Sequence, residues 1–292
     1  MTEPSNHVRI TLIHGVLQRI ADDAGVRMLH IKGPAVAPEL LDVKTKVEDG
    51  EEVEVTVPRG SGDADVLVHP ADVRRFLKAV HRYGWVKKTS FYTGSAFGHA
   101  QNIYHPKIGN ADVHRYYPGL PESAFQQLWA NRGSVTLGNV NCPVPSLRAQ
   151  RLILLLHGAR SGPTHPDVGR AWGRASEEER ADVRYLAGLL NAELGLAAAL
   201  DELDGWEKHP EYLLWKHFRE ANPSRLNEWR ARWRAARTLR AKSRVVRSFI
   251  FFDPSSLEST LGHKPTAGEI AKRNVARIGT LVRELRRRRD EQ

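Results

Sequence analysis

The order of hydrophobic and polar positions divides the chain into two halves. In the first half, apolar side chains recur either at the spacing of a helix or at alternate positions, as in a half-buried strand. Helices and strands are interspersed there, which indicates an α/β fold for this half. The pattern predicts helices over about 6–24, 34–41 and 70–83, and strands over 26–31, 63–68, 85–88, 99–104 and 111–116.

The helix 6–24 is predicted to be amphipathic. Its apolar stripe consists of Val8, Leu12, Val16, Leu17 and Ile20. The short strand that follows should be buried, and it ends in the pair Lys32-Gly33, which suits a turn. Pro34 then suits the first position of the helix 34–41, because a proline there loses no hydrogen bond.

A run of valines and threonine alternating with charged residues occupies 43–57. Asp49-Gly50 near its centre is the dipeptide most suited to a tight hairpin turn. We therefore expect a solvent-facing β-hairpin, inserted between the strands 26–31 and 63–68.

The second half has helical spacing almost throughout. It predicts helices over about 146–160, 177–203, 210–221, 223–247 and 267–288, with breaks at Gly162-Pro163, Gly205, Pro223 and Asp253-Pro254. We expect two domains, an α/β domain over 1–144 and a helical domain over 145–292.

Composition narrows the class of protein. The chain has 292 residues, 41% of them hydrophobic, which is enough to bury a sizeable core. Its one cysteine, Cys142, excludes an internal disulfide and a cysteine-rich zinc site, and it suits a reducing compartment. The polar start 1–7 is unlike a signal peptide, and the apolar runs are too short to cross a bilayer. The expectation is a soluble, cytoplasmic protein with no membrane partner.

The formal net charge of +10 is concentrated in the C-terminal half. The segment 223–247 holds nine Lys and Arg residues and one acid, Glu228. This segment either contacts the phosphates of a nucleic acid or is a solvated face. Trp229 and Trp233 share one face of the predicted helix, and we expect them to pack against the core.

Three acidic residues are candidate metal ligands. Asp63 and Asp65 stand at positions i and i+2 of a predicted strand, and Asp112 lies on a strand of the neighbouring hairpin. Carboxylates this close repel one another unless a cation neutralises them, so we expect the cluster to be unfavourable without metal. Hard oxygen ligands favour Mg²⁺ or Mn²⁺. The alternative is that Asp63 and Asp65 only end a strand on its wet face.

Four motifs occur in a characteristic order: LHIKGPA over 29–35, RGSGDADVLV over 59–68, DVH over 112–114 and LLLHGARS over 154–161. Together they resemble an uncharacterised nucleotidyltransferase family of the DNA polymerase β-like superfamily, over about residues 8–160. The resemblance implies a nucleotidyltransferase-like core with a mixed sheet and flanking helices, followed by an all-α domain. One departure is that the glycine motif lies much further before the acids than is usual in the superfamily.

The resemblance also implies roles for the acids. Asp63 and Asp65 would bind the metal that bridges the triphosphate oxygens of a nucleoside triphosphate. Asp112 would join them around a second metal that activates an acceptor hydroxyl, and pyrophosphate would leave in line. Such an arrangement stabilises the attacking and the leaving oxygen, and it needs no protein nucleophile.

Four further residues are candidates for nucleotide binding. Gly33 would let backbone approach the phosphates at the start of the helix 34–41, and Lys32 would add charge; the alternative is an ordinary turn with a solvated lysine. Arg59 is either a phosphate clamp or a surface arginine that ends the hairpin. Ser61 lies too near Asp63 for the usual phosphate-binding geometry, although it can contact phosphate from a loop.

Two histidines complete the candidate site. His114 shares a strand face with Asp112, where it either orients the acceptor or a metal-bound water, or is a packed, hydrogen-bonded histidine. His157 follows Leu154, Leu155 and Leu156 on a helix, so a satisfied core or interdomain histidine is favoured over a catalytic one.

Two functions stay open. The first is a metal-dependent nucleotidyltransferase that moves a nucleoside monophosphate onto a hydroxyl of a small molecule, protein or RNA. The second is a catalytically silent module that binds nucleotide or nucleic acid. The presence of all three acids in order favours the enzyme, because a silent relative has no physical reason to keep acids that repel one another.

Overall fold

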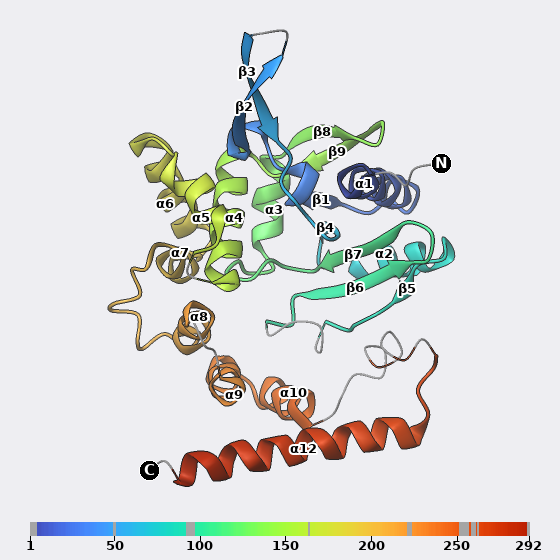
Figure 1. The fold of residues 1–292 in the computed structure, drawn as a ribbon, viewed down its shortest axis with the longest axis vertical. Coiled ribbons are helices and arrows are strands. Elements are labelled where there is room, and N and C mark those ends of the chain that lie inside the picture. The colour runs from blue at the N-terminus through green and yellow to red at the C-terminus, as the bar shows by residue number, and fades with distance from the viewer. Residues whose placement is uncertain are drawn as a thin grey trace.

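A five-stranded sheet organises the N-terminal half of the protein (Figure 1). The structure is a computed structural model that describes residues 5–48, 51–91, 97–162, 164–220, 224–250, 257, 261 and 263–290. The strand order is β1-β4-β7-β6-β5, in which β4 and β7 run parallel and the other neighbours antiparallel. The strands are β1 (Met28–Ile31), β4 (Ala64–Val68), β5 (Val86–Lys87), β6 (Ala100–His105) and β7 (Gly109–His114).

Helices cover both faces of this sheet, and the alternation of strand residues decides which face each side chain enters. Val66 and Val113 pack with α1 (Asn6–Asp23) and α2 (Val73–Arg82) on one face. Leu29 and Leu67 pack on the other face, with α3 (Ala124–Ala130) and α4 (Leu147–Ser161). The sheet is therefore the middle layer of an α+β fold.

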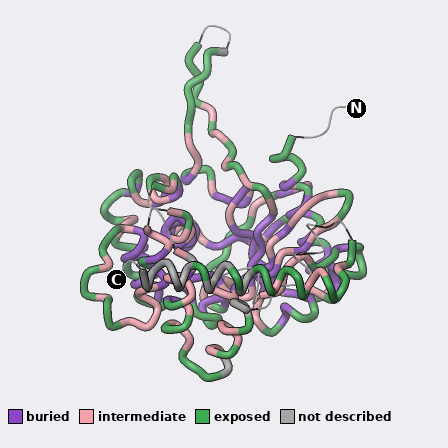
Figure 2. Tube along the Cα trace, turned by 60° about the horizontal axis from the view of Figure 1, so that its bottom comes forward, coloured by how far each residue is buried: buried purple, intermediate pink, exposed green. Residues whose placement is uncertain are grey.

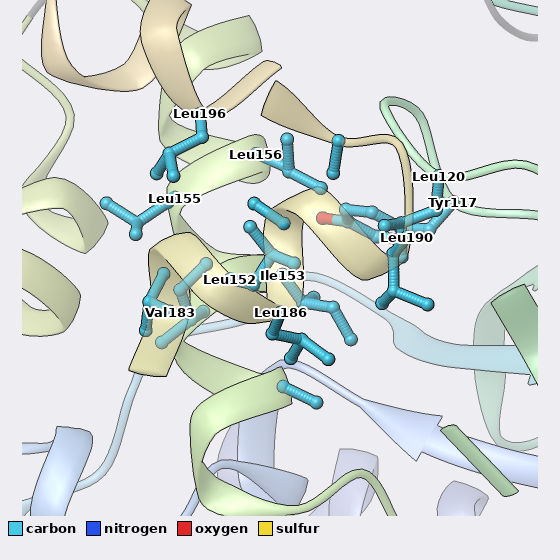
Figure 3. Packing of buried hydrophobic residues seen from close by; sticks show 14 of the residues in the cluster. Tyr117, Leu120, Leu152, Ile153, Leu155, Leu156, Val183, Leu186, Leu190 and Leu196 are labelled. Atoms are coloured by element: carbon cyan, nitrogen blue, oxygen red, sulfur yellow. The ribbon is translucent and has the colours of Figure 1, made fainter. Parts of the chain in front are cut away.

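The second half of the chain is helical, as expected. Its elements are α5 (Pro166–Val168), η3 (Gly169–Gly173), α6 (Glu177–Leu189), α7 (Glu193–Leu200), α8 (Tyr212–Arg219), α9 (Arg225–Ala235), α10 (Leu239–Ile250) and α12 (Ala267–Asp290). Figure 3 shows Leu152 and Ile153 of α4 packed with Val183 and Leu186 of α6. The predicted fold class, a mixed sheet with flanking helices followed by a helical region, is confirmed. No helix within the described residues is long and apolar enough to cross a membrane.

The hydrophobic core extends across residue 144, the predicted limit between the two domains. A single buried cluster joins Leu29 and Leu67 of the sheet to Leu152 of α4 and Trp215 of α8. The limits of the two domains stay a prediction.

Two hairpins stand apart from the main sheet. The predicted hairpin 43–57 is formed by β2 (Asp42–Glu48) and β3 (Glu51–Val57), and Figure 2 shows it projecting from the rest of the protein, exposed along most of its length. Its Asp49-Gly50 turn lies outside the described residues, as do the breaks expected at Pro163, Pro223 and Asp253-Pro254. The second hairpin, β8 (Gly133–Leu137) and β9 (Val140–Val144), was not predicted, nor was α3.

The predicted helix 34–41 is wrong. The chain forms two three-residue 3₁₀ helices, η1 (Gly33–Ala35) and η2 (Pro38–Leu40), with extended backbone at Val36 and Ala37 between them. The reason is Pro38, because a proline disfavours helical backbone at the residue before it.

Two long predicted helices are interrupted. The predicted helix 177–203 divides into α6 and α7 at Asn191, whose φ of 51° is left-handed. The predicted helix 223–247 divides into α9 and α10 after Ala235, and Trp233, with 38% of its surface exposed, does not pack against the core as expected.

The apolar stripe of α1 was predicted correctly at Leu17 and Ile20, which are buried, but wrongly at its other three residues. Val8, Leu12 and Val16 are exposed, whereas α1 buries the face formed by Ile10, Ile13, His14, Leu17, Gln18 and Ala21. The hydrophobicity pattern predicts that the polar side chains of His14 and Gln18 are exposed to solvent. Hydrogen bonds to His30 of β1 allow both polar side chains to enter the interior.

Candidate functional site

Two of the predicted acids lie side by side on the sheet. Asp65 of β4 and Asp112 of β7 are register partners, so their side chains project from the same face. Asn102 of β6 is the next register partner, and its Nδ2 donates to Asp112 Oδ1 at 2.8 Å. One ligand atom each of Asp65, Asp112 and His114 lie within 4.8 Å of one another. The sheet therefore brings Asp65 together with Asp112 and His114 of a strand that is distant from it in the sequence.

Asp65 is a buried carboxylate with two charged or polar partners. Lys32 Nζ lies 2.7 Å from its Oδ1, and His114 Nε2 lies 2.8 Å from the same oxygen. Burial alone would raise the pKa of Asp65, but the Lys32 ammonium and the hydrogen bond from His114 outweigh it and hold the pKa well below its usual range. For Asp65 the expectation of an unfavourable charge without metal is wrong, because Lys32 supplies the cation.

Asp63 has the unfavourable negative charge that the sequence predicts for the acid cluster. It stands one residue before β4, is partly buried, and has its pKa raised to about 7 by burial and by the neighbouring carboxylates of Asp65 and Asp112. Lys32 opposes this rise only weakly. Asp63 is therefore the acid of this cluster whose negative charge its surroundings disfavour.

The donor set fits a hard divalent cation. Asp63, Asp65 and Asp112 offer carboxylate oxygens, which Mg²⁺ and Mn²⁺ prefer. The raised pKa of Asp63 shows that the place favours added positive charge. In this arrangement His114 directs its Nε2 at Asp65, so His114 acts as a hydrogen-bond donor to a candidate ligand.

The turn after β1 has an unusual backbone. Lys32 and Gly33 have φ values of 58° and 50°, and the first of these is uncommon for a residue with a side chain. Ser61 lies directly beside Gly33, since a Cβ built on Gly33 would be 3.3 Å from Ser61 Cβ and 3.5 Å from its Oγ. A glycine and a serine from separate segments therefore form a cradle, which we call the Gly33–Ser61 cradle. The predicted helix 34–41 is absent, and the three-residue η1 begins at Gly33 in its place.

Arg59 is neither a surface residue nor an open clamp. Its Nε and Nη2 donate to the two carboxylate oxygens of Asp167 at 3.0 and 2.7 Å, and only 8% of its side chain is exposed. Asp167 is fully buried; burial would raise its pKa, but His157 and Arg59 hold it well below the usual range. His157 Nδ1 lies 2.8 Å from Asp167 Oδ2, which agrees with a satisfied interdomain histidine.

Asp167 was missed by sequence reasoning. It lies in a short segment, HPD over 165–167, whose letters show no catalytic motif. The ligand atoms of His157, His165 and Asp167 lie within 4.8 Å of one another. Arg59 and Arg170 already donate to the carboxylate, and two guanidinium groups disfavour a further cation there.

A cavity of about 780 Å³ lies between the segment 115–121 and the helices α7 to α10, and none of the three acids lines it. Tyr116, Trp215 and Arg232 line it, together with Phe97. The rings of Phe97 and His99 are 6.3 Å apart, and those of His99 and His114 are 5.0 Å apart. Rings in contact therefore connect the cavity wall with His114, which donates a hydrogen bond to Asp65.

No family model and no curated protein matches this chain. Several solved structures are similar to it, and two of them follow. The lincosamide antibiotic adenylyltransferase LnuA, with lincomycin bound, is 14% identical with a TM-score of 0.31, over 59% of this chain and 92% of that one. An antigenic nucleotidyltransferase-like protein from Paracoccidioides brasiliensis is 15% identical with a TM-score of 0.34, over 68% and 94%. Values this low assign neither family nor activity.

Proposed function

We propose that this protein is a metal-dependent nucleotidyltransferase that moves a nucleoside monophosphate from a nucleoside triphosphate to an acceptor hydroxyl. The observation that carries the proposal is the acid cluster: Asp65 and Asp112 are adjacent on one sheet face, and Asp63 beside them has a pKa raised to about 7. A protein gains nothing in stability from such a charge, which suits a site built to receive a divalent cation.

Each part of the site has a role in this reaction. The acceptor oxygen attacks the α-phosphorus, the bond to the bridging oxygen breaks, pyrophosphate leaves, and the hydroxyl proton passes to solvent. Asp63, Asp65 and Asp112 would hold Mg²⁺ or Mn²⁺, which supplies positive charge to the attacking and the leaving oxygen. The Lys32 ammonium would leave Asp65 and bind a phosphate oxygen instead. The Gly33–Ser61 cradle would bind the phosphates.

The acceptor would bind in the cavity whose wall residue Phe97 is linked through the His99 ring to His114. Its walls combine aromatic rings with Arg232, Arg237 and Arg244, opposed by Glu193 and Glu211. This lining suits an acceptor with both a flat apolar part and negative charge. A small molecule, a protein side chain and an RNA end all remain candidates, and basic residues of α9 and α10 would contact the phosphates of the last.

The test is transfer of label from α-labelled nucleoside triphosphates, with Mg²⁺ or Mn²⁺ and cell extract as the source of acceptor. Asp63→Asn, Asp65→Asn and Asp112→Asn should each lower turnover at least about a hundredfold, the scale expected when a group that positions a catalytic metal is lost. Asp182→Asn, on an exposed position of α6, is the matched control and should behave like the parent.

Thermal unfolding separates the enzyme from the silent module. Triphosphate with Mg²⁺ should raise the Tm of the parent but not of the three variants, because a ligand that binds only the folded state stabilises it. Stabilisation without any transfer of label would favour the silent nucleotide-binding module. Variants that transfer label as fast as the parent would show that the acids have no such role.

A further inference from the structure

A chain of hydrogen bonds runs along the buried face of α1 and fixes the protonation of two histidines. Gln18 Nε2 donates to the exposed Asp22 carboxylate at 2.7 Å, so Gln18 Oε1 is the atom that faces His30 Nε2, at 2.8 Å. His30 therefore carries its proton on Nε2 and accepts at Nδ1. His14 Nδ1 lies 2.8 Å from His30 Nδ1 and must be the donor.

This order leaves the other nitrogen of His14 without a proton and without a partner. His14 has 0% of its surface exposed, and its Nε2 makes no hydrogen bond within the described part of the chain. A buried polar atom in that state costs about 1–3 kcal/mol. Such a cost calls for a functional reason or an unseen ligand.

The unpaired atom borders the Gly33–Ser61 cradle. An atom at the Cβ position of residue 33 would be 4.0 Å from His14 Nε2 and 3.5 Å from Ser61 Oγ. A side chain at position 33 would crowd Ser61, so glycine lets a ligand oxygen approach this turn, where Ser61 Oγ and His14 Nε2 are the nearest polar side-chain atoms.

We propose that His14 is a phosphate-binding residue of this site: on binding of the triphosphate its imidazole takes up one proton from solvent and donates Nε2–H to a phosphate oxygen. The Nδ1–H bond to His30 is kept, and the hydrogen bonds through Gln18 to the Asp22 carboxylate stabilise the positive charge. The inference rests on the proposed triphosphate binding and adds to it a residue outside the acid cluster.

The charges around His14 explain why the proton arrives with the ligand. Burial lowers the pKa of His14 to about 4, and Asp65 raises it only partly, so the ring is neutral at pH 7 in the free protein. A phosphate anion beside Nε2 favours the protonated form. The strands packed against α1 carry His30, Asp65, Asp112, His114 and Cys142, with Lys32 after β1 and Asp63 before β4; of these groups, His30 contacts His14 and Asp65 acts on it through its charge. Asp72, just before α2, and Arg75 of α2 form a charged pair at the other end of α1, where Arg75 donates to the Gly25 carbonyl.

Titration calorimetry with α,β-methylene ATP and Mg²⁺ tests the proposal in buffers of different ionisation enthalpy. At pH 7 the parent should take up about one proton more than His14→Gln, whose amide can donate without titrating. Between pH 6 and 8 the affinity of the parent should fall by up to about tenfold per pH unit relative to that of His14→Gln, because only the parent must acquire this proton. His14→Phe should bind about ten to a hundred times more weakly.

His7→Gln, at an exposed position of the same helix, is the matched control and should match the parent. The nucleotide and Asp63 bind or release the same number of protons in the parent and in His14→Gln. The difference in proton uptake between these two proteins therefore reports on His14 alone. Equal proton uptake and equal pH dependence of these two proteins would overturn the inference while leaving triphosphate binding intact. Absence of binding by the parent would overturn the proposed function, and the role of His14 with it.

Discussion

At the scale of single residues, two neighbouring carboxylates of the site differ in their charged surroundings. Asp65 has the Lys32 ammonium and the His114 ring as partners, whereas Asp63 faces two other acids. The D-x-D pattern of the sequence predicts both acids but cannot distinguish them. The distinction comes from Lys32, which lies 33 positions before Asp65 and reaches it only because β1 and β4 are antiparallel neighbours.

This contrast predicts opposite effects of two similar substitutions. The pKa of Asp63 is about 7 in the folded protein and near 3.8 otherwise, so its ionisation removes stability as the pH rises from 4 to 7. In chelator, Asp63→Asn should therefore raise the free energy of unfolding at pH 8 by about 1–3 kcal/mol and by less than half as much at pH 5, where only the unfolded chain has ionised at this position. Chemical denaturation at both pH values measures this.

Asp65→Asn is the paired control, with the opposite sign. The pKa of Asp65 is lowered, so its contribution is present above about pH 4 and is lost only in stronger acid. Removing the carboxylate leaves buried Lys32 unpaired, which should cost about 3–5 kcal/mol at both pH values. Equal and small effects of the two substitutions would show that the acids are not held as described.

At the scale of elements, the sequence predicts best where hydrophobic periodicity decides. The strands of the sheet and most of α1, α2 and α4 were placed within a few residues. The errors fall where one residue sets the backbone, as Pro38 does between η1 and η2, or where polar side chains are buried in pairs, as His14 is with His30. Neither hydrogen-bonded pairing nor left-handed backbone can be read from periodicity.

The break between α6 and α7 shows such a residue. Asn191 is exposed and has φ 51°, a conformation that asparagine tolerates better than most residues with a side chain. Asn191→Ala should lower the free energy of unfolding by about 1 kcal/mol, although alanine favours helices, because alanine is strained at this φ. Asn191→Gly should be at least as stable as the parent. If alanine stabilised the protein, the two helices would form one continuous helix, as the sequence predicts.

At the scale of the whole molecule, the site is assembled from both halves of the chain. Arg59 before β4 is held by Asp167 from beyond α4, a pair separated by 108 positions. Asp42, at the base of the projecting hairpin, pairs with Arg170 and Arg174 of the helical half. Sequence motifs locate the acids, the cradle glycine, Arg59 and the partners of Asp65, but Asp167 and Asn102, which hold Arg59 and Asp112, come from segments with no motif. Those two residues could be found only from the packed structure.

The hairpin itself should be dispensable for the fold. Val47 is 69% and Val53 40% exposed, so β2 and β3 bury little apolar surface. Removing 45–54 and joining the register partners Lys44 and Val55 through Asn-Gly should keep the Tm within about 3 °C, because short surface segments without buried side chains contribute little stability. Thermal unfolding and triphosphate binding of the shortened protein measure this.

The base of the hairpin should behave differently from its tip. Asp42 accepts hydrogen bonds from Arg170 and Arg174, which hold its pKa below the usual range despite some burial. Because it is one-third exposed, Asp42→Asn should cost no more than about 1 kcal/mol, yet still more than removal of the tip. A shortened hairpin that loses more stability than Asp42→Asn would mean that β2 and β3 hold the fold together, and that the insertion is part of the core architecture.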